Sequence, residues 1–358
     1  EINRVIKALL SYGARMPKEL MLFAKNMVFL DSAIATLAPD VDLFAEITHL
    51  AMYFAQTHGT SIAAAIGVEE ESYAVDLSAV KAYPGVRAVL TASGIPGSNQ
   101  VSPVHRNDEP VLADGLVEFA GQPVFAVAAD TRRAARKAAC LARIEYEELP
   151  AILDLETARE EESWVLDPQF LSRGDARTAI AESPHRVRGE LRTGGQDHFY
   201  LEGQISRAIP GEDGDVLVHT SSQHPSEVQQ LIAESLGRPA AAVTVEVRRM
   251  GGAFGGKETQ AAQWAIIAAL LADRTGRSVK LRLDRDDDMR STGKRHDFLI
   301  RYDAGFDEQG RIAGIEFMHA LRCGISADLS GPIGDRAMFH CDNAYYLPNV
   351  SVESYRCR

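Results

Sequence analysis

The sequence contains few cysteines and no excess of basic residues. Its four cysteines, Cys140, Cys323, Cys341 and Cys357, are scattered and form no CxxC pair, so we expect no iron–sulfur or zinc site built by this chain alone. We interpret them as thiols of a protein in the reducing cytoplasm. The net charge of -12 argues against nucleic-acid binding, which depends on clustered Lys and Arg.

Long uninterrupted apolar runs are also missing. The most apolar early stretch, residues 19–39, contains Lys25 and Asp31, so it predicts neither a transmembrane helix nor a signal peptide. The chain begins with Glu1 rather than Met and stops directly after an expected strand. We therefore expect both ends to be truncated.

Hydrophobic periodicity and Pro/Gly punctuation divide the chain of 358 residues into four parts. Residues 1–75 predict a helical segment, and residues 76–152 a small α/β unit. Residues 153–190 are polar and predict a connector. Residues from about 165 to 358 predict a larger mixed α/β domain, with strands at 215–221, 242–250, 279–285, 298–306 and 311–321 and helices at 225–237 and 259–276.

The glycine-rich stretch MGGAFGGKE, residues 250–258, resembles a phosphate-binding P-loop with one departure. Glu258 stands where magnesium ligation requires Ser or Thr. Glycines between a strand and a helix permit positive φ and let backbone N–H groups approach an electron-rich ligand. A tight turn is the alternative, with Phe254 either presented to a pocket or packed into the core. Glu258 alone also fits the first turn of a helix that begins near it.

Gln223 and Arg336 are two further polar candidates. Gln223 stands at the end of a strand and precedes Pro225, which suits the first turn of a helix. Arg336 is followed by an apolar stretch. Taken singly, Gln223 is typical of a turn and Arg336 of a surface ion pair.

Gln223, Glu258 and Arg336 can be interpreted together, because they lie in passages that follow one another in the order found in one protein family. The five passages are GGQDHFYLEGQ (194–204), SSQHPSEVQ (221–229), RRMGGAFGGKETQ (248–260), LDRDDDMRSTGKRH (283–296) and DLSGPIGDRAMFHCDNAYYLPN (328–349). From about residue 84 to the end, the chain resembles the molybdenum-binding subunit of bacterial xanthine dehydrogenase, in the xanthine oxidase family of molybdenum hydroxylases. The spacing agrees with that family, with 35 residues from Gln223 to Glu258 and 78 from Glu258 to Arg336.

The resemblance implies a fold and a cofactor. Residues 76–152 would form the family's α/β hammerhead domain, and residues 165–358 part of its first molybdopterin-binding domain. Gln223 would hydrogen-bond an oxygen-type ligand of molybdenum, and Gly252, Ala253, Phe254 and Gly255 would lie against the cofactor. No side chain of this chain would coordinate the metal directly.

The resemblance also implies catalytic roles for Glu258 and Arg336, which would hold a purine from opposite sides. The expected reaction is oxidation of hypoxanthine or xanthine to urate, with water as the oxygen source. The family's base, a glutamate, lies in a second molybdopterin domain, so we expect no activity from this chain alone. Iron–sulfur and FAD groups are expected on partner subunits or domains, in an oligomer. An aldehyde oxidase-like enzyme remains an alternative.

Residues 1–75 suggest a different origin. They resemble the C-terminal tail of ubiquinone-biosynthesis-type atypical kinases, but carry none of the kinase motifs. The junction is expected between residues 66 and 84. A natural fusion and a joining of two truncated frames both stay open, as does a non-catalytic hybrid in which the helical segment serves interaction.

Overall fold

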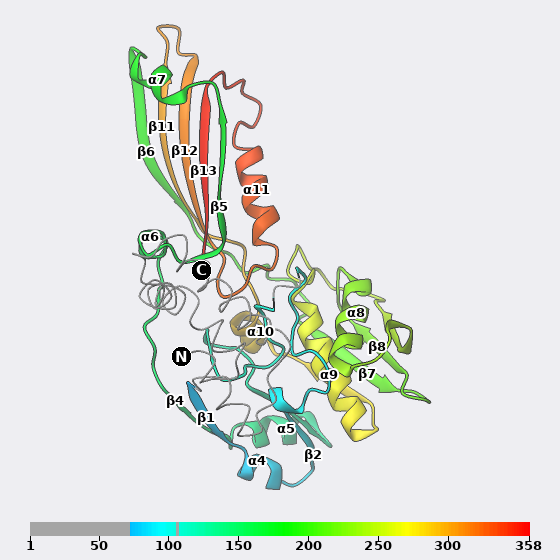
Figure 1. Cartoon of the computed structure of the whole chain (residues 1–358). Coiled ribbons are helices and arrows are strands. Elements are labelled where there is room, and N and C mark those ends of the chain that lie inside the picture. Colours follow the sequence, from blue (N-terminus) through cyan, green and yellow to red (C-terminus); the bar gives the residue numbers. More distant parts are fainter. Residues whose placement is uncertain (1–71, 105–106) are drawn as a thin grey trace, which may run out of the picture. The chain divides into compact units, whose positions relative to one another are not determined.

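The computed structural model describes residues 72–104 and 107–358, which belong to a unit spanning Glu71–Arg358 (Figure 1). Of the helical, kinase-tail-like segment that we predicted for residues 1–75, residues 1–71 lie outside the described residues. The helical prediction is wrong for residues 73–75, which belong to a strand. Within the described part of the chain, no helix is both long and apolar enough to cross a membrane.

The first described part is a small α/β unit. Strand β1 (Tyr73–Asp76) pairs antiparallel with β4 (Arg143–Tyr146), and β2 (Val86–Thr91) pairs antiparallel with β3 (Phe125–Ala129). The connecting helices are α4 (Ser78–Ala82), the 3-10 turn Ala92–Gly94 and α5 (Arg132–Ala139). Helix α5 begins directly after Thr131, because the Thr131 side chain accepts a hydrogen bond from the Ala134 N–H.

A four-stranded sheet forms the next layer, in the order β10 (Val279–Arg282), β7 (Ile205–Pro210), β8 (Val216–Thr220) and β9 (Val243–Glu246). Strands β8 and β9 run parallel and are joined by α8 (Pro225–Leu236) and the 3-10 turn Ala240–Ala242. Pro225 opens α8 and Gly237, in the left-handed conformation, closes it.

Helix α9 (Ala261–Thr275) is the centre of the largest core. Every residue from Ala261 to Ala272 is buried. The helix packs on β7, β8, β10 and α8, and also on β2 and β3 of the small unit. Its many alanines allow these layers to approach closely. As a result, one continuous apolar cluster joins residues of both parts, from Leu90 and Leu112 to Val218 and Ile267.

A five-stranded sheet completes the described structure. Its order is β5 (Trp164–Arg173), β13 (Val350–Cys357), β12 (Ile312–Arg322), β11 (Phe298–Phe306) and β6 (His185–Thr193), and only the β12–β13 pair is parallel. Helix α11 (Ser330–Phe339) lies along β13, as Figure 1 shows. The remaining helices are α6 (Leu155–Glu160), α7 (Ala176–Ala181) and α10 (Arg285–Ser291). The predicted mixed α/β class is confirmed.

Two details differ from the sequence-based expectations. The polar segment 153–190, predicted as a connector, contains α6, β5, α7 and most of β6. Strands β5 and β6 form the two edges of the five-stranded sheet. Most side chains of β6 are exposed, so its sequence lacks an apolar signal, and Pro168 lies within β5, where it argues against a strand. In addition, α9 begins at Ala261 rather than near Glu258, because the preceding residues form turns.

The packing of α9 makes a testable prediction. Replacing the fully buried Ala265 by Leu should lower the free energy of unfolding by roughly 1–3 kcal/mol, because added methyl and methylene groups overpack a filled core. Ala181→Leu, on the exposed end of α7, is the control and should change it by less than about 0.5 kcal/mol. Urea denaturation measures both. Equal effects of the two substitutions would contradict the assignment of α9 as the central packing element.

Candidate functional site

The glycine-rich loop lies between β9 and α9 and has an unusual backbone. Gly251, Gly252 and Gly255 have φ of 66, 91 and 93°, and Phe254 has φ of 55°. A non-glycine residue in the left-handed region costs on the order of 1–2 kcal/mol, so the surrounding structure must hold the turn. Phe254 is 76% exposed, which settles one open alternative. Its ring is presented outward rather than packed in the core.

Packing beneath the loop requires glycine as much as the backbone angles do. A Cβ added to Gly251 would come within 2.4 Å of the Glu202 side chain. A Cβ on Gly256 would come within 2.7 Å of the rings of His198 and Tyr200. The loop therefore sits directly on the segment that contains the passage GGQDHFYLEGQ.

Lys257 is fully buried and points away from any ligand on the outer side of the loop. Its Nζ donates to the carbonyl oxygens of Glu202 (2.7 Å) and Met250 (2.5 Å) and to the Ser221 hydroxyl (2.8 Å), and lies 4.6 Å from the centre of the Tyr200 ring. Burial lowers the pKa of Lys257 to about 8, so the ammonium form still predominates at pH 7. With all three donors used internally, Lys257 has none left for a phosphate, and the P-loop interpretation is excluded.

A buried hydrogen-bond network supports the loop from below. The Tyr200 hydroxyl donates to Asp288 Oδ1 (2.6 Å), and the Gln204 N–H donates to Asp288 Oδ2 (2.8 Å). The Gln204 side chain donates to the Gly256 carbonyl (3.0 Å) and to the Tyr200 hydroxyl (3.0 Å). Two of the five sequence passages thus fix the loop, a role that we did not assign to Tyr200, Gln204 or Asp288 from sequence.

Gln223 contacts the loop directly. Its side-chain oxygen accepts hydrogen bonds from the backbone N–H groups of Gly255 (3.0 Å) and Lys257 (3.3 Å), and its own N–H donates to the Lys257 carbonyl (2.8 Å). The residue is exposed at the end of β8. Within the described chain its amide Nε2 forms no hydrogen bond. Gln223 therefore both shapes the loop and offers a free donor beside it.

The loop also carries unused backbone donors. Among the described residues, the N–H groups of Gly252, Ala253 and Phe254 have no hydrogen-bond acceptor. Consecutive N–H groups on a loop with positive φ form a concavity suited to an electron-rich ligand. Together with the Gln223 amide, they fit a bulky group rich in acceptors better than a cation.

Glu258 follows the loop and lies among other carboxyl groups. Burial raises the pKa of Glu227 and of Asp328, and the Glu258 carboxylate contributes to both shifts. The three carboxyl groups are therefore within electrostatic reach of one another. Glu258 is exposed and forms no ion pair with any described residue, which leaves its oxygens available to a hydrogen-bond donor.

Arg336 stands on α11, separate from the loop. Ser330, Gly334 and Met338 form the buried face of this helix, and Arg336 lies outside that face and is exposed. Its side chain forms no hydrogen bond or ion pair with the described residues. No contact joins Arg336 to Glu258. Asp328 connects the loop that contains Glu258 to α11. It directly precedes this helix, and the charge of Glu258 contributes to the raised pKa of Asp328.

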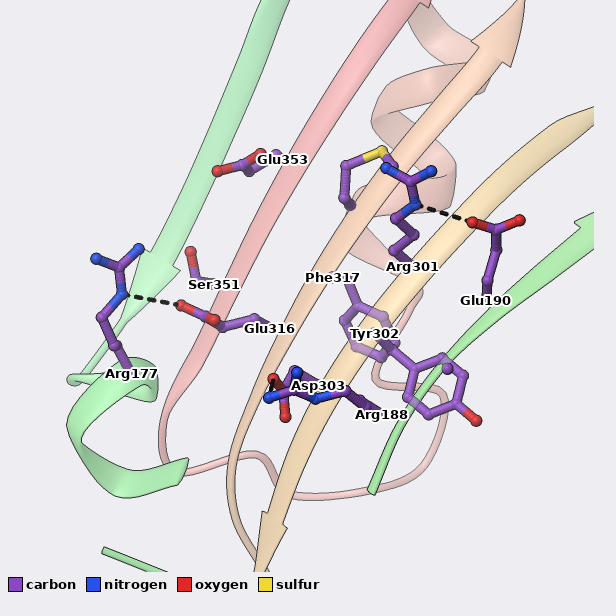
Figure 2. A pocket seen from close by; sticks show the side chains of 12 residues that line it. Arg177, Arg188, Glu190, Arg301, Tyr302, Asp303, Glu316, Phe317, Ser351 and Glu353 are labelled. Carbon is purple, nitrogen blue, oxygen red and sulfur yellow. Dashed lines mark hydrogen bonds and ion pairs between the residues drawn. The ribbon is translucent and has the colours of Figure 1, made fainter. Parts of the chain in front are cut away.

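A separate cavity of about 520 Å³ lies on one face of the five-stranded sheet (Figure 2). Figure 2 shows that its charged side chains face one another across the strands. Six of them form three pairs: Arg177 with Glu316, Arg188 with Asp303, and Arg301 with Glu190, whereas Glu353 has no ion pair among the described residues. None of the residues that we selected from sequence lines it. With most of its charges already paired, this cavity is a weaker candidate than the glycine loop.

Comparisons with known proteins agree with this arrangement. Residues 160–358 match the model of the molybdopterin cofactor-binding domain, and residues 44–150 match the a/b hammerhead domain of aldehyde oxidase and xanthine dehydrogenase. The chain belongs to the family of molybdopterin cofactor-binding domains. The predicted hammerhead and the predicted cofactor class are thereby confirmed.

Curated relatives carry xanthine dehydrogenase names. The chain is 40% identical to xanthine dehydrogenase/oxidase of Gallus gallus over 285 residues, which are 79% of this chain and 21% of the relative. It is 40% identical to xanthine dehydrogenase of Calliphora vicina over 287 residues, with the same two shares. The chain thus spans about a fifth of the length of these relatives.

Solved structures show the same fold at lower identity. The aldehyde oxidoreductase from Desulfovibrio gigas has a TM-score of 0.73 at 24% identity, covering 80% of this chain and 34% of that one. Quinoline 2-oxidoreductase from Pseudomonas putida 86 has a TM-score of 0.67 at 24% identity, covering 80% and 39%. The predicted kinase-tail resemblance of residues 1–75 has no support here, and the hammerhead match overlaps it from residue 44 onward.

The contacts of Gln223 lead to a prediction for the loop. Gln223→Ala removes the shared acceptor, so hydrogen–deuterium exchange at the N–H groups of Gly255 and Lys257 should accelerate about 5-fold, as expected for the loss of roughly 1 kcal/mol per bond. Gln223→Glu keeps an acceptor and should retain protection. Gln230→Ala, on the exposed side of α8, is the control. Unchanged exchange in Gln223→Ala would mean that this side chain does not hold the loop.

Proposed function

We propose that this chain forms part of a molybdenum hydroxylase of the xanthine dehydrogenase type, which oxidises hypoxanthine and xanthine to urate with water as the oxygen source. The observation that carries the proposal is an unpaired, exposed carboxylate, Glu258, placed directly after a donor-rich glycine loop. The identity of about 40% to curated xanthine dehydrogenases supports it.

The loop fits the molybdenum cofactor in its chemistry. When bound, that cofactor supplies the two-electron oxidation. The N–H groups of Gly252, Ala253 and Phe254 would donate to its electron-rich atoms, and the Gln223 amide would donate to an oxygen ligand of the metal. The exposed Phe254 ring would cover its apolar side. The glycines keep side chains out of this space.

Glu258 and Arg336 would divide the recognition of the purine between them. A purine such as xanthine offers ring N–H donors, which suit a carboxylate that has no cation partner. Negative charge that develops on a purine carbonyl oxygen during oxidation would be stabilised by the guanidinium of Arg336. Both side chains are exposed and unpaired within the described residues, as ligand-binding groups would be.

Parts outside this chain would complete the enzyme. We propose that a further molybdopterin domain supplies the general base, since a base must lie within hydrogen-bond reach of the proton it removes. Iron–sulfur and FAD groups on partner domains or subunits would accept the electrons. The isolated chain would then bind but not turn over purine, and the complete assembly would work as an oligomer in the cytoplasm.

Glu258→Val in the completed enzyme tests whether Glu258 selects a purine over an aldehyde as the substrate. We expect kcat/KM for xanthine to fall roughly 10- to 100-fold, the equivalent of a charge-assisted hydrogen bond of about 1.5–3 kcal/mol. Turnover of an aromatic aldehyde should change much less, because an aldehyde offers no N–H donor to the carboxylate. Glu212→Val, an exposed residue in the turn between β7 and β8, is the matched control.

The molybdenum content of both variants must equal that of the parent enzyme, so that the rates compare recognition rather than cofactor loading. An equal fall for xanthine and aldehyde would show that Glu258 does not recognise the purine, and would favour an aldehyde oxidase-like function instead.

A further inference from the structure

A second group of carboxyls connects the hammerhead part to the turn before α11. Asp108 Oδ2 accepts a hydrogen bond from the Ala327 N–H (2.8 Å), and Glu109 Oε2 accepts one from the Ser326 hydroxyl (3.2 Å). Asp328, the next residue of the same turn, has φ of 37° and is therefore held in a strained conformation. These contacts anchor the beginning of the helix that carries Arg336.

The residues that follow Glu258 join the same group. The Gln260 side chain interacts with the carboxyls of both Glu109 and Asp328, and Thr259 interacts with Asp328. Gln260 Oε1 also accepts a hydrogen bond from the Gly293 N–H (2.9 Å). Glu109, Gln260, Gly293 and Asp328 line one cavity of about 520 Å³. Three chain segments, distant in sequence, therefore meet at Gln260.

No cation among the described residues forms an ion pair with the carboxyls of this group. Burial, with a further contribution from the Asp328 carboxylate, raises the pKa of Glu109 to about 8. Burial likewise raises the pKa of Asp328, and the charges of Glu258 and Asp108 act in the same direction. The Oδ1 atoms of Asp108 and Asp328 are buried without a hydrogen-bond partner among the described residues. Two ionised carboxylates here would repel each other in a poorly solvated place.

Basic groups that line the cavity are engaged elsewhere. Lys294 pairs with Asp197 (3.4 Å) and Arg322 with Asp297 (3.2 Å). Arg295 donates to the Gln196 side chain (2.8 Å).

Two further titratable groups on the cavity wall are uncharged at pH 7. Burial lowers the pKa of His296, whose Nε2 lies 2.8 Å from the Ser330 hydroxyl, and burial raises the pKa of the Cys323 thiol to about 11. Arg290 also lines the wall, but neither Glu109 nor Asp328 has a cation among its main electrostatic neighbours.

We propose that Glu109 and Asp328 carry one shared proton at neutral pH instead of two negative charges, and that this protonated pair positions both arms of the candidate site. It holds Glu258 through Thr259 and Gln260, and it holds the helix of Arg336 through the turn 326–328. Glu109 and Asp328 are thus positioning residues. Their link to substrate recognition rests on the proposed function, whereas the shared proton does not.

The sign of the expected pH dependence follows from the raised pKa of Glu109. A carboxyl whose pKa is higher in the folded than in the unfolded chain takes up a proton on folding. Its stabilising contribution is fully present below the ordinary value of 4.5 and is lost as the pH rises through about 8. Across this window the contribution of Glu109 to the stability of the folded chain should be lost and the turn 326–328 should loosen.

The experiment compares the 358-residue chain with Glu109→Gln, Asp328→Asn and the control Glu145→Gln, whose carboxyl is exposed on β4. Urea unfolding midpoints are measured from pH 5 to 9, together with hydrogen–deuterium exchange of the Ala327 N–H, corrected for its intrinsic pH dependence. We expect the midpoint of the parent and of Glu145→Gln to fall relative to that of Glu109→Gln as the pH rises, because Lys257 and the buried histidines titrate alike in all variants, and we expect Ala327 to lose protection. Both responses should be flattened in Glu109→Gln and in Asp328→Asn.

A pH dependence of Glu109→Gln equal to that of Glu145→Gln would overturn the proposal. If Glu109→Gln does not fold, Asp328→Asn decides alone, and it must show the flattened response. Neither measurement depends on molybdenum or purine, so a failure of the proposed enzyme activity would be distinguishable from a failure of the shared proton.

Discussion

The burial of α9 is the constraint on which the candidate site depends. This helix has apolar or small residues on all sides over its first three turns, and it is covered by the four-stranded sheet on one side and by β2 and β3 on another. A helix that is apolar all round must be enclosed. Its enclosure fixes the end of the glycine loop that leads into it, and therefore the position of Glu258.

From that fixed end, the loop is held against its support by a buried cation. In a phosphate-binding loop the lysine reaches outward to its ligand, whereas Lys257 turns inward and satisfies two carbonyl groups and a hydroxyl. The inward lysine leaves the outer face of the loop with backbone donors and no formal positive charge. A lysine at this position of the loop can therefore either bind a ligand or support the loop from inside. Lys257 supports the loop, because the acceptors on Glu202, Ser221 and Met250 lie on the inner side.

Local sequence signals predicted several regular elements of the larger domain. Helices α8 and α9 and strands β8, β11 and β12 were expected within a few residues of their observed bounds, because each carries a clear apolar period or a terminal Pro or Gly. Strand β6 was missed since most of its side chains are exposed, and β5 was missed since Pro168 interrupts its sequence. The glycine loop and Gln223 could be selected because glycine and strand-end signals are local.

The supporting residues of the site could not be predicted in the same way. Tyr200 and Asp288 are 88 positions apart, and Asp108 and Ala327 are 219 apart. The residues next to each of them in sequence therefore give no signal that predicts the contact. Arg336 by itself is typical of a surface ion pair, and only the family resemblance gave it a functional role. Its relation to Glu258 runs through Asp328 rather than through a direct hydrogen bond or ion pair. Long-range polar contacts of this kind depend on the assembled fold and produce no periodic pattern in the sequence.

The charges of the site separate two kinds of ligand. At the loop, N–H donors without acceptors favour a group rich in electron pairs. Only a few residues further on, Glu258 stands with Glu227 and Asp328, and this concentration of carboxyls disfavours an anion. A neutral ring with N–H donors suits the acidic side, whereas an acceptor-rich cofactor suits the loop. In the proposed reaction, the purine offers N–H donors and the molybdenum cofactor offers acceptors. One short stretch of chain can therefore orient both ligands, each at its own place.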